Sequence, residues 1–259
     1  MRRSGLTFPS VSRIVTELLE AGMLREGAKR RGGKGKPPMD LTIDPNHGYS
    51  VGIYLDGDQA NGRFVNALGE PLKGVSLSAT SLAGGISTAL DESGFDPNKL
   101  VGVCLSAPSE VIRDDQRARL AVELGVSIFA ETAIAASVQA ERYFGIASEL
   151  NSFLYFDAVR PELGAMVNHS VLAKPGTLEA LLGMQQGESS AGSDKLPRAI
   201  KGAALLIQAE ALIVSGLSAE EIEGLSGQVA DVPVVPASAQ AGDLTLAAAS
   251  VPLYETLSK

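Results

Sequence analysis

The chain has 259 residues with 45% hydrophobic and 20% charged residues, and its formal net charge at pH 7 is −8. This much apolar material can form a full core, so a disordered chain is excluded, while one cysteine (Cys104) and two histidines exclude a disulfide and support neither a metal site nor a cofactor. No apolar stretch approaches 18 residues and no apolar signal core follows the N-terminal arginines, so we expect a cytoplasmic protein.

The first predicted element is a helix that begins after Thr7, which fits the N-cap position, with Pro9 in the first turn. Apolar residues recur along it at helical steps and form one face: Val11, Ile14, Val15, Leu18 and Leu19. The start of the helix and its other face carry Thr7, Ser10, Ser12, Arg13 and Thr16. Short polar and cationic side chains of this kind contact bases and phosphates from a helix in a major groove.

A basic, glycine-rich segment follows that helix. Ala21-Gly22 ends the helix, and a strand is predicted from Leu24. Four cations then alternate with glycines ahead of Pro37-Pro38, which is typical of a hairpin that approaches a DNA groove closely: Arg30, Arg31, Lys34 and Lys36. Residues 1–40 hold 9 Lys/Arg and 4 Asp/Glu, whereas residues 41–259 hold 13 and 26, so DNA binding is expected only in this head. The alternative is a solvated helix with a disordered basic tail.

The pattern becomes α/β from residue 41. Strands are predicted at 50–57, 62–68 and 72–78, a helix at 80–93, a buried strand at 100–108, a helix at 114–124, a strand at 126–130 and a helix that ends at Gly145. The second half repeats this order, with strands at 151–157, 162–168 and 169–173, a helix at 199–210, a strand at 211–216, a helix at 219–225, a strand at 232–238 and a closing helix at 243–257. Residues 183–197 are predicted to be an exposed loop.

This duplication predicts a two-lobed α/β domain of the βββαβαβα type, as in the actin/hexokinase and RNase H folds, behind a partial winged helix-turn-helix. We expect a head at 1–40, a first lobe at 41–147 and a second, shortened lobe at 148–259. A ligand cleft is expected between the lobes.

The head, its basic Gly-Pro wing, Glu141–Gly145 (ERYFG) and Ala211–Ser218 (ALIVSGLS) together resemble the ROK family of sugar kinases and sugar-responsive repressors, and the match is to the repressor branch. The resemblance covers residues 1–173 and 199–259. It implies operator binding by a winged helix within a homo-oligomer, and a kinase-like domain that senses a sugar or a sugar phosphate.

The sequence departs from the family's kinases at each catalytic element. Tyr54 stands in place of the first phosphate-turn carboxylate, and Asp56 and Asp58, which flank Gly57, are interpreted as turn residues rather than metal ligands. Ala133 stands in place of the catalytic base, leaving Glu131 and Thr132 as the weak candidates for ligand binding, although a glutamate that begins a helix is more often structural.

The second phosphate loop and the zinc loop differ as well. Residues 160–164 (RPELG) replace the glycine-rich phosphate loop, the cysteine-rich zinc loop is absent, and His169 is interpreted as a surface residue. The resemblance and these departures imply a protein that is not an enzyme.

The head is also shorter than a complete winged helix-turn-helix, because only residues 1–6 precede the recognition helix. We expect either more coding sequence upstream of Met1, or a reduced head whose apolar face is covered by another chain. The leading hypothesis is a ROK-like, DNA-binding regulator that acts as a homodimer or larger homo-oligomer. A sugar kinase and a scaffold that binds neither DNA nor sugar are the alternatives.

Overall fold

The structure is a computed structural model, and it describes residues 7–29, 39–108, 112–174, 176–182, 195–229 and 231–257. The predicted wing residues Arg30, Arg31, Lys34 and Lys36 lie outside these ranges, as do residues 183–194 of the predicted loop.

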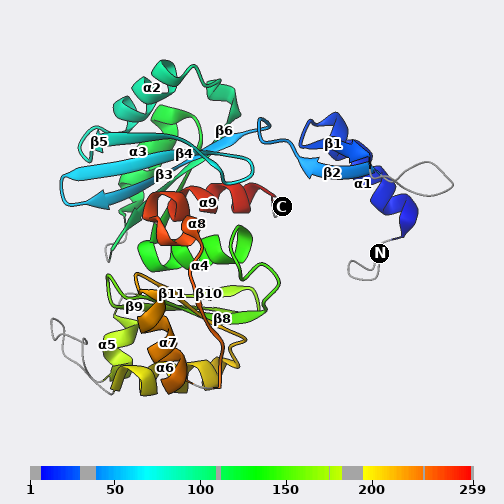
Figure 1. The fold of residues 1–259 in the computed structure, drawn as a ribbon. Coiled ribbons are helices and arrows are strands. Elements are labelled where there is room, and N and C mark those ends of the chain that lie inside the picture. The colour runs from blue at the N-terminus through cyan, green and yellow to red at the C-terminus, as the bar shows by residue number, and fades with distance from the viewer. Residues whose placement is uncertain are drawn as a thin grey trace.

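The N-terminal part contains helix α1 (Phe8–Glu20) and a hairpin of strands β1 (Leu24–Lys29) and β2 (Met39–Ile43). The Thr7 side chain caps the helix, and Gly22 (φ +69°) follows its end, as predicted. No residue of α1 is buried, and this part lies to one side of the two sheets (Figure 1). Strand β2 continues to Ile43, beyond the predicted boundary between the head and the first lobe at residue 40. That domain boundary remains a prediction.

The first large sheet has the strand order β5-β4-β3-β6-β7. Its strands are β3 (Tyr49–Asp56), β4 (Gln59–Asn66), β5 (Pro71–Ser78), β6 (Leu100–Ala107) and β7 (Ser127–Thr132). The helices between them are α2 (Leu82–Ser93), η1 (Pro97–Lys99) and α3 (Asp114–Leu124), and α4 (Ala133–Tyr143) follows β7. Strand β6 is central and almost entirely buried, as predicted, and Cys104 within it is fully buried.

The second large sheet has the order β10-β9-β8-β11-β12, which repeats that of the first sheet position by position. Its strands are β8 (Ser152–Asp157), β9 (Glu162–Val167), β10 (Ser170–Leu172), β11 (Leu212–Ser215) and β12 (Val234–Pro236). The helices are α5 (Thr177–Leu182), α6 (Lys195–Ile207), α7 (Ala219–Gln228), α8 (Ala239–Gly242) and α9 (Leu244–Leu257). The shared order confirms the two α/β units predicted from the sequence.

The molecule is layered (Figure 1). Helices α2 and α3 cover the outer face of the first sheet, α4, α8 and α9 lie between the sheets, and α6 and α7 cover the outer face of the second. Small residues allow this middle layer to pack closely, since Ala136, Ala140 and Ala247–Ala249 are fully buried. Helix α9, although it follows the second sheet in the chain, packs against β3 and β6 of the first.

Several elements differ from their predicted form. Helix α5 was not predicted, and α6 begins at Lys195, so the last three residues of the predicted loop are helical. The predicted closing helix at 243–257 is confirmed as α9 (Leu244–Leu257), whereas the short helix α8 before it was not predicted. The Asp243 carboxylate accepts hydrogen bonds from the backbone N–H groups of Thr245 (2.9 Å) and Leu246 (3.3 Å) and so starts α9. Among the described residues no helix is long and apolar enough to cross a membrane.

Candidate functional site

The polar face of α1 carries the described candidates for DNA contact. Ser12 and Arg13 are exposed, whereas Thr7 Oγ1 accepts from the Ser10 backbone N–H (3.5 Å) and lies 2.9 Å from Ser10 Oγ. The Arg13 guanidinium lies 3.6 Å from the Glu17 carboxylate, with the two side chains 77% and 62% exposed. Such an exposed pair stabilises a helix only weakly, so the guanidinium can exchange this partner for a phosphate.

The turn between β3 and β4 contains the segment that the resemblance aligns with the first phosphate turn of the family's kinases. Asp56 pairs with Gln59 across a two-residue connection in which Gly57 has φ +58°. Asp56 and Asp58 are both exposed there. The structure thus confirms that they are hairpin-turn residues.

The junction of β7 and α4 contains the segment that the resemblance aligns with the catalytic segment of the family's kinases. Thr132 is the N-cap of α4, and its hydroxyl accepts from the Ala135 backbone N–H at 3.2 Å. Ala133 is buried and has no group that accepts a proton. Burial raises the pKa of the Glu131 carboxyl, a hydrogen bond with Gln139 opposes that rise, and the charge of Glu255 adds to it. These contacts place the Glu131 side chain against α4 and α9.

The turn between β8 and β9 contains the segment that the resemblance aligns with the second phosphate loop of the family's kinases. Asp157, 4% exposed, accepts from the backbone N–H groups of Val159 (3.0 Å) and Arg160 (3.2 Å) and pairs with the Arg160 guanidinium. Backbone N–H groups and a guanidinium are the donors that a phosphate would use, and here a carboxylate of the chain holds them. The guanidinium carbon of Arg160 lies 6.0 Å from the ring centre of Tyr54 on the other sheet.

A row of polar side chains crosses the first sheet beside this contact. Asn61, Tyr54, Ser106 and Glu131 are in register on β4, β3, β6 and β7. Residues in register share a face, and Gly52, two residues before Tyr54, directly approaches α9, so the row faces the middle layer. The Ser106 hydroxyl is fully buried and has no hydrogen-bond partner within the described ranges.

Sequence reasoning identified Tyr54, Ala133 and residues 160–164 as departures from the kinase pattern and kept Glu131 as a weak candidate for ligand binding, but it did not single out Asp157 or Ser106. Asp157 is the last residue of β8 and Ser106 the second-last of β6, and ligands of α/β sheets often lie at such strand ends. Only the strand register, however, places Ser106 beside Tyr54.

The ERYFG segment has a structural role in the middle layer. The Glu141 carboxylate is fully buried and accepts from the backbone N–H groups of Ile146 (3.0 Å) and Ser238 (2.5 Å). Burial raises the pKa of this carboxyl, and the two hydrogen bonds oppose the rise. His169 lies in the β9–β10 turn with φ +67°, exposed and with Nδ1 3.1 Å from the Arg142 guanidinium, as the surface interpretation predicts.

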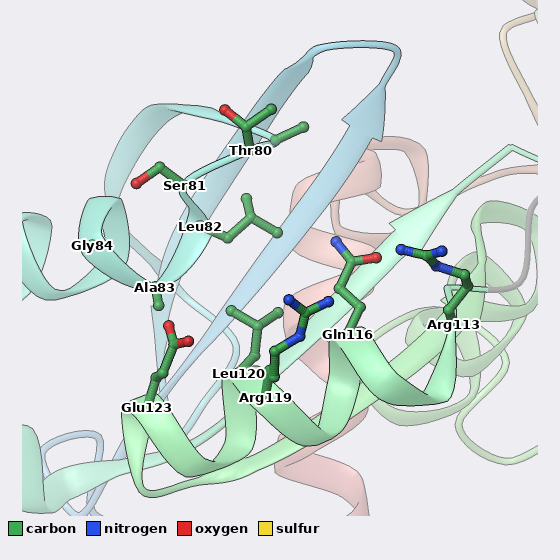
Figure 2. Close-up of a pocket in the computed structure, with 11 residues that line it drawn as sticks. Thr80, Ser81, Leu82, Ala83, Gly84, Arg113, Gln116, Arg119, Leu120 and Glu123 are labelled. Carbon is green, nitrogen blue, oxygen red and sulfur yellow. The ribbon is translucent and has the colours of Figure 1, made fainter.

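A surface cavity of about 450 Å³ lies on the outer side of the first sheet, between the start of α2 and the exposed face of α3 (Figure 2). Gln116, Arg119 and Glu123 extend from α3 toward residues 80–84. Arg113 and Arg119 both pair with Asp115, at 3.6 and 3.3 Å. The described residues contain no group of three or more His, Cys, Asp or Glu side chains that could hold a metal ion.

No protein-family model matches the sequence, and no curated protein matches it either. Solved structures do match. A ROK family transcriptional regulator, a homologue of the E. coli MLC protein, aligns over 99% of this chain and 91% of its own, with a TM-score of 0.68 and 14% identity.

Other solved structures align over less of the chain. A ROK hexokinase from Thermus thermophilus aligns over 78% of this chain and 97% of its own, with a TM-score of 0.53 and 19% identity. A ROK family protein from Streptococcus pneumoniae TIGR4, solved with sucrose, aligns over 82% of this chain and 100% of its own, with a TM-score of 0.59 and 12% identity. The chain therefore has the two-sheet α/β fold of ROK family proteins, and its structural neighbours include both a ROK transcriptional regulator and ROK kinases.

Proposed function

We propose that this protein is a non-catalytic transcriptional regulator of the ROK family, a repressor of sugar-related genes that binds operator DNA through its N-terminal head. The observation that carries the proposal is the extent of the structural match. The regulator aligns over 99% of the chain, whereas the hexokinase aligns over 78%. The difference between these two aligned lengths is large enough to contain the whole head, residues 1–40.

The chemistry of the head supports DNA binding. Ser12 and Arg13 project from the exposed face of α1, and Thr7 and Ser10 lie at the start of that helix, where backbone N–H groups also face outward. Arg30, Arg31, Lys34 and Lys36 follow in a segment that joins β1 to β2. We assign base contacts to Ser10, Ser12 and Arg13, and phosphate or minor-groove contacts to the four cations.

The geometry of the kinase-like domain argues against phosphoryl transfer. Ala133 offers no proton acceptor at the position of the base, and the adjacent Thr132 hydroxyl is engaged in capping α4. The donors of the β8–β9 turn are held by Asp157, whose negative charge also repels phosphate. A kinase would need a proton acceptor in place of Ala133, and donors in the β8–β9 turn that are free to bind phosphate.

The proposal includes a homodimer or larger homo-oligomer in the cytoplasm, because two heads on two half-sites strengthen a weak single contact. A sugar or a sugar phosphate is the proposed effector. Glu131 and Thr132 remain the residues to test for its binding. A thermal-shift screen would detect such an effector, since a ligand at 100 times its Kd stabilises a protein by about 2.7 kcal/mol.

Two assays on the full chain test the proposal. Selection from a library of random-sequence duplexes should enrich one sequence that contains two half-sites. A coupled ATP assay over a panel of hexoses should give no turnover. Sugar-dependent ATP consumption by the purified chain would contradict the proposal, and failure to enrich any sequence would contradict its DNA-binding part.

A further inference from the structure

The two lobes contact one another at Arg160 and Tyr54, away from the helices of the middle layer. Tyr54 is near the end of β3 in the first sheet, and Arg160 is in the turn that connects β8 to β9 in the second. The guanidinium carbon lies 6.0 Å from the centre of the Tyr54 ring, which is the range in which a cation and an aromatic ring attract each other. This contact joins segments that are more than 100 residues apart in the chain.

Arg160 is held in place from its own lobe. The Asp157 carboxylate binds the Arg160 guanidinium and the backbone N–H groups of residues 159 and 160 together, so turn and side chain are fixed as one unit. The Asp157 carboxylate is almost fully buried, whereas Val159, in the same turn, is exposed. Asp157 therefore orients the guanidinium toward the first lobe.

The contact is partly shielded from water, since Tyr54 is half-buried and the Arg160 side chain is 30% exposed. Arg160 Nε is buried and has no hydrogen-bond partner among the residues that the structure describes. Burial raises the pKa of the Tyr54 phenol, and the charge of Arg160 opposes that rise. Exclusion of water strengthens the attraction between a cation and a ring. A buried donor without an acceptor, in contrast, has a cost, so the Nε group of Arg160 offsets part of this attraction.

From these observations we propose that Arg160, oriented by Asp157 and resting on Tyr54, is a latch that helps the shared core to hold the two lobes in the relative arrangement described above, without any ligand. This inference does not depend on DNA binding or on the identity of an effector. Opening the lobes separates Arg160 from Tyr54 and exposes Nε to water, while the Asp157 pair remains within the second lobe.

The test measures the distance between the lobes by pulsed electron paramagnetic resonance on the full chain. Cys104, the one cysteine, is replaced by Ala, and spin labels are attached to cysteines introduced at Val122 on α3 and Leu206 on α6, each 84% exposed. We expect a single narrow distance distribution in this background. Arg160→Ala and Tyr54→Leu should each broaden it and shift it to longer distances.

Tyr54→Phe is the matched control, because it keeps the ring and removes only the hydroxyl that hydrogen-bonds Arg160; if the ring carries the contact, the distribution should stay narrow. If Arg160→Ala does not fold, the comparison of Tyr54→Leu with Tyr54→Phe decides the question alone. A narrow, unshifted distribution in folded Arg160→Ala or Tyr54→Leu overturns the proposal, and so does equal broadening in Tyr54→Phe and Tyr54→Leu.

Discussion

Gly52 shows how closely the last helix approaches the first sheet. A Cβ atom at this position would lie 2.1 Å from the Thr245 carbonyl oxygen and 2.2 Å from the Ala249 backbone nitrogen. Both are backbone atoms of α9, so a side-chain rotation cannot relieve the clash. The Ser50 hydroxyl, two residues earlier, donates to the Ala249 carbonyl at 2.6 Å and fixes the same approach. Glycine at residue 52 is thus required by packing.

We predict that Gly52→Ala lowers the free energy of unfolding by about 1–3 kcal/mol or more, because α9 must move away from β3. Gly202→Ala is the matched control, since a Cβ atom at Gly202 on α6 meets nothing within 4 Å. This second change should stabilise the protein by about 0.5–1 kcal/mol through helix propensity. Urea unfolding of both variants measures the two values, and an unaffected Gly52→Ala would show that α9 does not pack as described.

The free energy of unfolding should depend on pH through Glu131, and a substitution can remove that dependence. Its folded-state pKa is raised, mainly by burial, so its contribution to stability is fully present below the pKa of the unfolded chain and is lost as pH rises through the folded pKa. Glu131→Gln keeps a partner for Gln139 and has no carboxylate to bury. The variant should therefore gain stability relative to the native protein as pH rises from 4 to 8.

Urea unfolding at a series of pH values between 4 and 8 measures this gain. Glu123→Gln, at an exposed position on α3, serves as the control and should follow the native protein throughout. A constant difference between Glu131→Gln and the native protein at all pH values would mean that Glu131 is not buried as described.

At the scale of elements, the sequence predicted what local chemistry determines. Thr7 and Gly22 predict both ends of α1, and the alternation of strand and helix predicts nearly all the elements of the two lobes. The start of the closing helix at Asp243 was also predicted, and the Asp243 side chain forms local hydrogen bonds at the start of α9. The short helix α8 before it was not predicted. The contact of Arg160 with Tyr54 depends on the packing of two lobes, which no local pattern encodes.

The wing and the helix of the head should affect DNA binding in different ways. Replacing Arg31 and Lys34 together by Ala should weaken binding to all duplexes alike, because phosphate contacts carry no sequence information. Arg13→Ala should instead reduce the preference for the selected sequence, by about 1–3 kcal/mol if Arg13 contacts a base.

Fluorescence anisotropy with the selected duplex and a scrambled duplex separates these two effects. Lys201→Ala is a control, because this substitution also removes one positive charge, but from the second lobe. There Lys201, on α6, pairs with Asp231 at 2.7 Å. If the wing variant lost affinity for the selected duplex alone, the assignment of these cations to phosphates would be wrong.

At the scale of the whole molecule, the chain combines a duplicated acidic body with a basic head. The two large sheets have the same strand order, and their facing sides share a layer of small residues on α4 and α9. Residues 1–40 hold 9 Lys/Arg and 4 Asp/Glu, whereas the rest of the chain holds 13 and 26. An acidic body repels DNA, so any affinity for DNA must come from the head.

The salt dependence of DNA affinity is the measurement that tests the proposed function most directly. If the head of each copy makes four phosphate contacts, a plot of log K against log salt concentration should have a slope of about −3.6 per copy bound to duplex DNA. The full chain should show this slope on the selected duplex, and the Arg31→Ala, Lys34→Ala double variant should show a shallower one. Affinity that does not change with salt, or no binding at 50 mM salt, would contradict the proposal that this protein is a DNA-binding regulator.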